Sequence, residues 1–242
     1  MRRQLILLLQ KFLRQRYNKQ IVEIHSPFRD MVRLLHGKKI TLIVDGGAYH
    51  GVIAQELCSV FPGADVYAFE PYSVSFEKLR VAVRDCPQIH PVHCALSSHE
   101  EIKTLYVNAQ DSTNALSPVA EMGKKYQSWQ TENIQSETVK VTTLDLWAEN
   151  NTAASVDILK LDLQGYELEA LHGAERLLRN SVKLIYTEVE FVRLYEQNCL
   201  YYEMEAYLHR LGFRLYQLYN LSSGDDNQLV CADAIFIHPG RI

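Results

Sequence analysis

The feature that most constrains the fold is a short apolar run, residues 40–45, that ends in an acid and two glycines. The run is rich in β-branched residues, which is typical of a strand buried on both faces of a parallel sheet. It leads through Asp45 and Gly47 to Gly51 with the spacing D-x-G-x-x-x-G. Glycines there let a ligand approach the backbone, and a following helix offers free N–H groups to an anion. The segment therefore predicts a strand, a tight turn and a helix at a binding site.

Similar strand-like runs alternate with helical stretches along the chain. The further strands are expected at residues 65–69, 89–94, 156–161 and 182–189. One helix after the fourth strand is expected to carry Leu168, Leu171, Ala174 and Leu178 on its inner face. Two final runs, 213–219 and 229–237, flank a polar turn and indicate a hairpin. This order predicts an α/β fold with a mostly parallel sheet that ends in an antiparallel edge.

Residues 97–150 interrupt the alternation. They contain strand candidates at 102–107 and 138–143, separated by a polar stretch. An insertion between the third and fourth strands overhangs the edge at which α/β sheets bind ligands. It is either a substrate lid or a surface excursion with no role in binding.

The first 39 residues form an N-terminal helical extension, so residues 40–242 are expected to be the main domain. The apolar run 5–9 stops at Gln10-Lys11 and no small-residue cleavage site follows, so we do not expect a signal peptide. It is also too short to span a bilayer. An amphipathic basic helix fits the pattern, and its apolar stripe is Leu5, Leu8, Leu9, Phe12 and Leu13. We expect this helix to pack on the domain or on a partner subunit of a homo-oligomer, with docking to a membrane surface as the alternative.

Composition narrows the classes of partner. The chain has 25 Lys and Arg against 29 Asp and Glu, a net charge of −4. This balance argues against nucleic acid as a partner. The five cysteines are scattered and lack a C-x-x-C pair, so neither a disulfide framework nor a zinc knuckle is expected. A cytoplasmic location is the default for such a chain.

Three acids end three of the predicted parallel strands: Asp45, Glu70 and Asp162. Because the carboxyl ends of parallel strands share one edge, these side chains should face the same crevice. Glu70 is placed to accept the hydroxyls of a ribose. The dinucleotide fingerprint G-x-G-x-x-G is absent, and three carboxylates repel a pyrophosphate. S-adenosylmethionine, which carries a sulfonium, an ammonium and a ribose, fits better than NAD.

Short motifs recur in order along the chain: Val44-Asp45-Gly46-Gly47-Ala48-Tyr49-His50-Gly51, Ala68-Phe69-Glu70-Pro71, Ala95-Leu96, Thr143-Leu144-Asp145, Leu159-Lys160-Leu161-Asp162-Leu163-Gln164-Gly165-Tyr166-Glu167, Leu171-His172-Gly173-Ala174 and Thr187-Glu188-Val189-Glu190. This set covers residues 40–237 and resembles that of the FkbM-type methyltransferases. The resemblance implies a Rossmann-like, seven-stranded class I methyltransferase sheet with helices on both faces and a C-terminal hairpin. It also implies S-adenosylmethionine-dependent O-methylation of a sugar, glycan or natural-product hydroxyl.

The expected cofactor-binding residues follow the strand ends. We assign Asp45, Gly47 and Gly51 to the methionine end of the cofactor and Glu70 to its ribose. By resemblance, Ala95 and Leu96 lie near the adenine. Asp162 lies nearest the transferred methyl group and is the first candidate for catalysis.

Two further residues are candidates for catalysis. Glu190, or Glu188 beside it, is placed to orient an acceptor hydroxyl or help bind a metal, although a solvated surface acid is the alternative. His50 is a candidate general base because histidine titrates near neutral pH, but a lone histidine is more often structural. No histidine spacing indicates a metal site, so an acid-bound Mg²⁺ is only weakly suggested.

Two positions depart from the family pattern. The family usually has Asn where this chain has Tyr49, and it favours Glu where this chain has Gln164. These departures keep open a non-catalytic, methyltransferase-like module that serves assembly. A nicotinamide-dependent oxidoreductase is the other alternative, and cofactor preference separates it from a methyltransferase.

Overall fold

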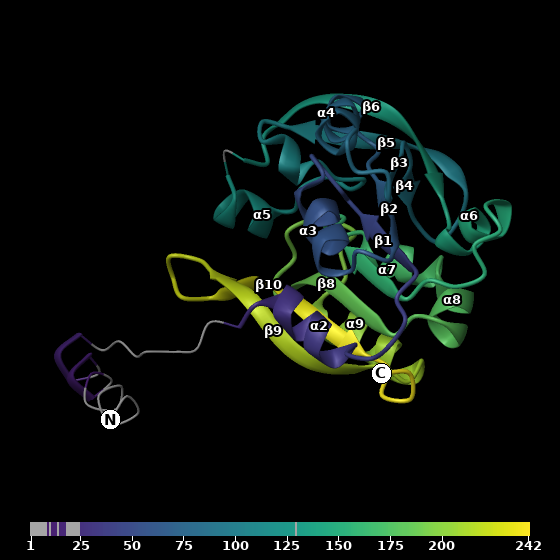
Figure 1. Ribbon diagram of the computed structural model, residues 1–242. Helices are drawn as coiled ribbons and strands as arrows, with labels where there is room; N and C mark the ends of the chain where they lie inside the picture. The colour runs from purple at the N-terminus through teal and green to yellow at the C-terminus, as the bar shows by residue number, and fades with distance from the viewer. Residues whose placement is uncertain (1–8, 10, 14, 18–24, 129) are drawn as a thin grey trace.

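The computed structural model describes residues 9, 11–13, 15–17, 25–128 and 130–242 (Figure 1). Most of the predicted N-terminal helix, including Leu5 and Leu8, lies outside these residues. The described part of it is helical, and Leu9 and Phe12 are 45% and 55% exposed. Among the helices that the structure describes, none is both long and apolar enough to cross a membrane.

A seven-stranded sheet forms the centre of the molecule, in the order β3-β2-β1-β7-β8-β10-β9. The first five strands in this order pair in parallel, whereas β10 is antiparallel to both β8 and β9. The bounds are β1 Leu42–Gly46, β2 Asp65–Phe69, β3 Ile89–Val92, β7 Ile158–Leu161, β8 Leu184–Glu190, β9 Arg214–Ser223 and β10 Leu229–Ile237. The predicted fold class is therefore confirmed, including the antiparallel hairpin at the C-terminal end.

Helices cover both faces of this sheet (Figure 1). Successive side chains of β1 point to opposite faces, so Ile43 and Val44 join different core clusters. The Ile43 cluster includes residues of α2 (Pro27–Leu34), α3 (Val52–Val60) and α4 (Ser73–Val83). The Val44 cluster includes residues of α6 (Leu144–Asn150), α7 (Glu167–His172), α8 (Glu175–Asn180) and α9 (Tyr201–Arg210).

Helix α2 packs on the sheet although it lies within the predicted N-terminal extension. Met31 is fully buried in the Ile43 cluster. The hydroxyl of Tyr219, on β9, donates to Asp30 Oδ2 at 2.8 Å. Arg33 also pairs with Asp30, at 3.0 Å. The division of the chain at residue 39 stays a prediction, and α2 itself lies against the domain.

The segment 97–150 forms most of a second, three-stranded sheet in the order β4-β6-β5. Its strands are β4 (Ala95–Leu96), β5 (Glu101–Asn108) and β6 (Asn133–Thr142). The short helices η1 (Asp111–Thr113) and α5 (Glu121–Tyr126) lie between β5 and β6 in the chain. The strands expected at 102–107 and 138–143 are confirmed, whereas their pairing in a separate sheet was not predicted. Leu105, Val107 and Val141 form a small core of their own with Tyr72 and Tyr166. Whether the segment serves as a substrate lid stays a prediction.

The single helix expected across residues 168–178 is wrong, because the chain breaks it into α7 and α8 at Gly173. A Cβ added at Gly173 would lie 1.9 Å from the backbone oxygen of Ser97. The backbone therefore approaches the second sheet too closely for any side chain at this position. The amphipathic spacing is correct, but a tertiary contact interrupts the helix.

The side chain of Asp145 caps the N-terminus of α8, the second of these two helices. Its carboxylate accepts from the backbone N–H of Arg176 at 2.8 Å and of Leu177 at 3.1 Å. Unsatisfied N–H groups of a first helical turn are commonly capped in this way. The Thr-Leu-Asp motif thus has a structural role, since Thr143 likewise accepts from Leu146 N–H and caps α6.

We predict that Gly173→Ala lowers the free energy of unfolding by about 2–3 kcal/mol, because backbone must move to admit the methyl group. Gly63→Ala is the matched control, since a Cβ there meets nothing within 4 Å. It should change stability by less than about 0.5 kcal/mol. Urea denaturation of the two variants measures both values, and equal midpoints would contradict the packing argument.

Candidate functional site

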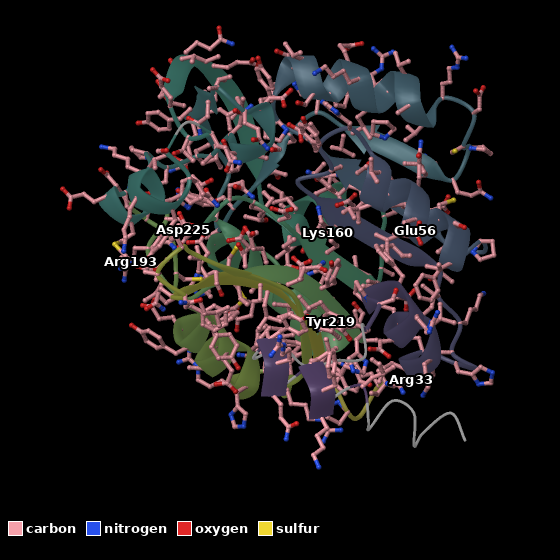
Figure 2. All side chains as sticks on the ribbon, turned by 90° about the vertical axis from the view of Figure 1, so that its left-hand side faces the viewer. Arg33, Glu56, Lys160, Arg193, Tyr219 and Asp225 are labelled. Atoms are coloured by element: carbon pink, nitrogen blue, oxygen red, sulfur yellow. The ribbon has the colours of Figure 1, made fainter. Side chains whose placement is uncertain are left out.

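A buried ion pair lies at the carboxyl ends of the two central strands. Asp45 on β1 and Lys160 on β7 are register partners, and Lys160 Nζ lies 2.8 Å from Asp45 Oδ1. Lys160 lies near the middle of the molecule, whereas Arg33 and Arg193 lie at its periphery (Figure 2). Burial opposes the charge on Lys160, but Asp45, Asp162 and Glu70 outweigh burial and raise its pKa. Lys160 therefore favours its charged form, whereas burial outweighs the attraction of Lys160 and raises the pKa of Asp45.

The same lysine holds the turn that follows β1, which we call the glycine turn (residues 46–51). Its Nζ also donates to the backbone oxygens of Gly46 and Gly47, at 3.2 and 2.8 Å. Gly47 has φ +71°, and a Cβ there would lie 1.8 Å from the backbone oxygen of Asp162. Only glycine fits, because the turn is pressed against the chain after β7.

The backbone N–H groups at the start of the glycine turn are already used. Gly47 and Ala48 both donate to the carbonyl of Phe69, at 3.0 and 2.9 Å. Gly51 caps α3 with φ +85°, and a Cβ there would press on Leu79 of α4 at 2.7 Å. The N–H groups of Gly47 and Ala48 are therefore not available to a ligand, and the predicted anion site at the start of the following helix stays a prediction.

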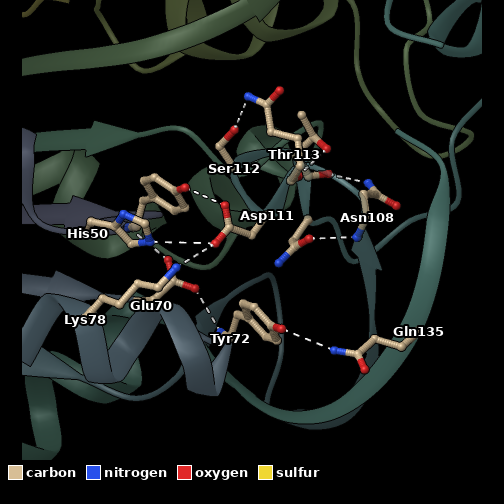
Figure 3. Close-up of polar contacts among 12 residues, drawn as sticks. His50, Glu70, Tyr72, Lys78, Asn108, Asp111, Ser112, Thr113 and Gln135 are labelled. Carbon is tan, nitrogen blue, oxygen red and sulfur yellow. Dashed lines mark hydrogen bonds and ion pairs between the residues drawn. The ribbon is translucent and has the colours of Figure 1, made fainter. Parts of the chain in front are cut away.

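Glu70 ties the glycine turn to the end of β2. Its Oε2 accepts from the backbone N–H of Tyr49 at 2.9 Å, and its Oε1 accepts from that of Tyr72 at 2.8 Å. The second of these bonds is drawn in Figure 3. Burial raises the pKa of Glu70 to about 7, although the two backbone donors oppose the shift. Each carboxylate oxygen keeps a lone pair, so a ribose hydroxyl can still donate to it.

A cavity opens between the glycine turn, the chain after β7 and the second sheet. Of the predicted site residues, Gly47, Glu70, Ala95, Leu96 and Asp162 line it. Its apolar part includes Phe69, Leu105 and Leu116, whereas Glu70 and Asp162 provide carboxylates. Asp45, Gly51, His50 and Glu190 are not among the lining residues of the described chain. The structure thus brings together five of the predicted residues and places the other four behind or beside the cavity.

Four carboxyl groups crowd the ends of β7 and β8, and we call Asp162, Glu167, Glu188 and Glu190 the acidic cluster. One oxygen each of Asp162, Glu167 and Glu188 lie within 4.8 Å of one another. In the part of the chain that the structure describes, none of the four is ion-paired with Lys, Arg or His. Asp162 is the member that faces the cavity.

Burial and mutual repulsion keep protons on much of this cluster near neutral pH. Burial first, and then the neighbouring acids, raise the pKa of Glu188 well above its ordinary value. Burial and Glu167 raise the pKa of Glu190 to about 8. Burial also raises the pKa of Glu167 to about 7, although backbone N–H groups donate to its carboxylate. Protons that stay on these three carboxyl groups reduce the negative charge beside Asp162.

Gln164 joins two members of the cluster. Its amide nitrogen donates to Asp162 Oδ1 at 2.7 Å and lies 3.4 Å from Glu188 Oε2. The buried Tyr195 donates its hydroxyl proton to Gln164 Oε1 at 2.7 Å, which fixes the orientation of the amide. A divalent cation held by Asp162, Glu167 and Glu188 would have to displace this amide from two of its three ligands.

In the described chain His50 and Glu190 do not line the cavity, and each contacts other residues. The ring of His50 stacks on that of Tyr49 at 3.5 Å, and its Nε2 lies 3.7 Å from Asp111 Oδ2 (Figure 3). Burial and Lys78 lower the pKa of His50. Glu190 accepts through Oε2 from Leu194 N–H at 3.3 Å and from the side chain of Asn198. Their catalytic roles stay predictions.

The sequence analysis assigned no site role to Lys160 or Asp111. The sequence could have indicated a role for Lys160, because a charged residue within an apolar, fully buried strand needs a partner. Asp111 carried no such indication, since it lies in a polar stretch whose path across the glycine turn depends on the second sheet.

A family model and one curated relative match this chain. A family model described as the methyltransferase FkbM domain matches residues 45–215. Hexuronic acid methyltransferase AglP of Haloferax volcanii is 29% identical over 164 residues, and the match covers 66% of this chain and 62% of AglP. The chain therefore aligns with less than two thirds of that relative's length.

Two solved structures are similar at low sequence identity. Fibrillarin of Aeropyrum pernix, bound to S-adenosyl-L-methionine, has a TM-score of 0.44 at 13% identity, covering 81% of this chain and 66% of that one. Precorrin-6y C5,15-methyltransferase of Geobacter metallireducens has a TM-score of 0.46 at 11% identity, covering 89% of this chain and 92% of that one.

The acidic cluster predicts a pH-dependent stability. Since folding raises the pKa of Glu190 from 4.5 to about 8, the folded protein binds more protons than the unfolded chain between these values. The free energy of unfolding should therefore fall as the pH rises through this window. Glu190→Gln should remove at least about 1 kcal/mol of that fall. Denaturant titrations of the wild type and Glu190→Gln at pH 5.5 and 8.5 measure the free energy of unfolding. An equal decrease between the two pH values in both proteins would contradict the raised pKa of Glu190.

Proposed function

Because the chain belongs to the FkbM methyltransferase family, we propose that it transfers the methyl group of S-adenosylmethionine to a hydroxyl of a carbohydrate acceptor. The observation that carries the proposal is the cavity between the glycine turn and Asp162, which is apolar in one part and lined by carboxylates in another. A cofactor with a flat heterocycle, a ribose and two cationic groups matches these two kinds of lining.

The residues present fit each part of this cofactor. Ala95, Leu96, Leu105 and Leu116 offer an apolar slot for the adenine. Glu70 offers carboxylate oxygens at the end of β2, where a ribose binds in folds of this kind. Asp162 supplies a carboxylate for the cationic end. Asp45 acts indirectly, because it is fully buried and holds Lys160 beneath the glycine turn.

Asp162 is the proposed proton acceptor. S-adenosylmethionine supplies an electrophilic methyl group, and most of the rate of such a displacement comes from alignment. The Gln164 amide occupies Asp162 Oδ1 and so leaves Oδ2 to accept the proton of the attacking hydroxyl. Asp162 would take the hydroxyl proton as the acceptor oxygen takes the methyl group from sulfur, whose bond to that group breaks to leave S-adenosylhomocysteine.

A carbohydrate acceptor is supported by two observations. AglP is by name a methyltransferase of hexuronic acid. The net charge of −4 and the acidic cluster beside the cavity disfavour a polyanion such as RNA. We therefore place the acceptor among sugars and uncharged or singly charged glycans.

A nicotinamide-dependent oxidoreductase is less well supported. A pyrophosphate needs free backbone N–H groups in the first turn. Those of Gly47 and Ala48 are donated to Phe69 instead. Carboxylates at Glu70 and Asp162 would add repulsion.

We predict that Asp162→Asn weakens S-adenosylmethionine about tenfold and S-adenosylhomocysteine less than about threefold, because only the first carries a sulfonium charge. Calorimetric titration measures both affinities, and we expect the wild type to bind at about micromolar Kd, near −8 kcal/mol. Asp85→Asn is the control, since Asp85 is exposed and remote from the lining. An equal loss of affinity for both ligands would contradict the placement of Asp162 beside the sulfonium of the cofactor.

We predict methyl ether formation on a panel of methyl hexosides and methyl hexuronosides supplied with methyl-labelled S-adenosylmethionine. NMR of the product distinguishes an ether from a methyl ester. Asp162→Asn should lower turnover by about 100-fold or more, the usual contribution of a general base. Ester formation would overturn the proposal that the acceptor group is a hydroxyl, and turnover unaffected by the substitution would overturn the role of Asp162 as proton acceptor. Binding of NAD instead of either adenosyl ligand would favour the oxidoreductase.

A further inference from the structure

One wall of the cavity comes from the insertion. Asp111, Ser112, Asn114 and Leu116 line it, although they are remote in sequence from the glycine turn and the chain after β7. The first three belong to a turn, residues 110–114, whose Asp111 and Ser112 lie opposite His50 and Glu70 in Figure 3. We call this turn the insertion turn.

The insertion turn is closed by its own hydrogen bonds. Asn108 N–H donates to Asn114 Oδ1 at 2.8 Å, and the Asn108 amide donates to Thr113 O at 2.6 Å. The Thr113 hydroxyl lies 2.8 Å from Gln110 O and 2.9 Å from Gln130 O. The turn is therefore a preformed unit, and its position over the cavity depends on what its outer residues contact.

Asp111 makes the contacts on the side of the glycine turn. The hydroxyl of Tyr49 donates to Asp111 Oδ1 at 2.5 Å, and Lys78 Nζ on α4 lies 3.1 Å from Asp111 Oδ2 (Figure 3). His50 Nε2 lies 3.7 Å from the same oxygen. Burial opposes the charge on Asp111, but Tyr49 and Lys78 outweigh burial and lower its pKa. Three side chains from two elements thus converge on one carboxylate.

The opposite side of the insertion turn reaches the residues that hold Asp162. Thr113 O lies 3.4 Å from the hydroxyl of Tyr195. That hydroxyl gives its proton to Gln164, whose amide donates to Asp162. The insertion turn therefore spans the cavity, from the glycine turn at Asp111 to the Tyr195–Gln164 pair at Thr113.

We propose that Asp111 is a cofactor-positioning residue, which fastens the insertion turn to Tyr49 of the glycine turn so that both close on the bound cofactor. The inference rests on the proposed function and extends it, because it assigns part of the insertion to the cofactor. Asp111 acts through Tyr49, and Lys78 and His50 support its charge. A cofactor held in this way leaves the site only when the Asp111–Tyr49 contact opens.

The test is the rate of dissociation of S-adenosylhomocysteine from the full chain, measured by stopped-flow displacement. Tyr49→Phe removes only the hydroxyl and keeps the ring on His50, whereas Asp111→Ala removes the carboxylate. Each should raise the dissociation rate about fivefold or more while the association rate stays within about twofold. Because both break one contact, the double variant should dissociate no faster than about twice the rate of the faster single variant.

Two further measurements separate positioning from a general loss of structure. Asp111→Asn keeps an acceptor for Tyr49 and removes the charge, so its dissociation rate should fall between those of the wild type and Asp111→Ala. Asp85→Asn, an exposed acid of the same type, should leave the rate unchanged. Hydrogen exchange should show protection of residues 109–116 on ligand binding in the wild type and not in Asp111→Ala.

The outcomes are distinguishable. Unchanged dissociation rates, or effects of Tyr49→Phe and Asp111→Ala that multiply in the double variant, would overturn the role of Asp111 and leave the proposed function standing. A wild-type chain that binds neither adenosyl ligand would overturn the proposed function, and with it this inference.

Discussion

The buried pair of Asp45 and Lys160 is the interaction on which the site depends. It joins the carboxyl ends of β1 and β7, and the same ammonium group holds two carbonyls of the glycine turn. Breaking a buried pair by removing one partner leaves an uncompensated charge, which commonly costs about 3–5 kcal/mol. The pair therefore fixes the turn at Gly47 against the backbone of Asp162, and the cavity has its shape because these two segments touch.

The carboxylates of the site divide into two kinds according to their partners. Asp45 is neutralised by Lys160 and faces inward. Within the described residues, the members of the acidic cluster form no ion pair, and burial and repulsion raise the pKa of Glu167, Glu188 and Glu190. Gln164 and Tyr195 then provide neutral hydrogen bonds in place of a counter-charge. This arrangement costs stability at high pH, and it leaves a carboxylate at Asp162 free for a cationic ligand and a reacting hydroxyl.

The mostly parallel sheet, the hairpin and the positions of Gly47, Glu70 and Asp162 at the cavity were predictable, because strand ends and glycine spacing are local signals. Ala95 and Leu96 were predicted only by resemblance to the family. Three features were not. The break at Gly173 and the second sheet arise from contacts between distant segments, which periodicity does not encode. The position of Asp111 depends on that sheet in turn. The prediction that Asp45 contacts the cofactor was made without Lys160, the buried residue of β7 that pairs with it.

One cofactor is proposed to lie between the glycine turn, Asp162 and the insertion turn. A crystal structure of the chain with S-adenosylhomocysteine would test this placement. We expect the adenine between Leu96 and Leu116, the ribose against Glu70 and the sulfur beside Asp162. A ligand bound elsewhere on the molecule, or one whose sulfur lies at the apolar end of the cavity, would contradict it.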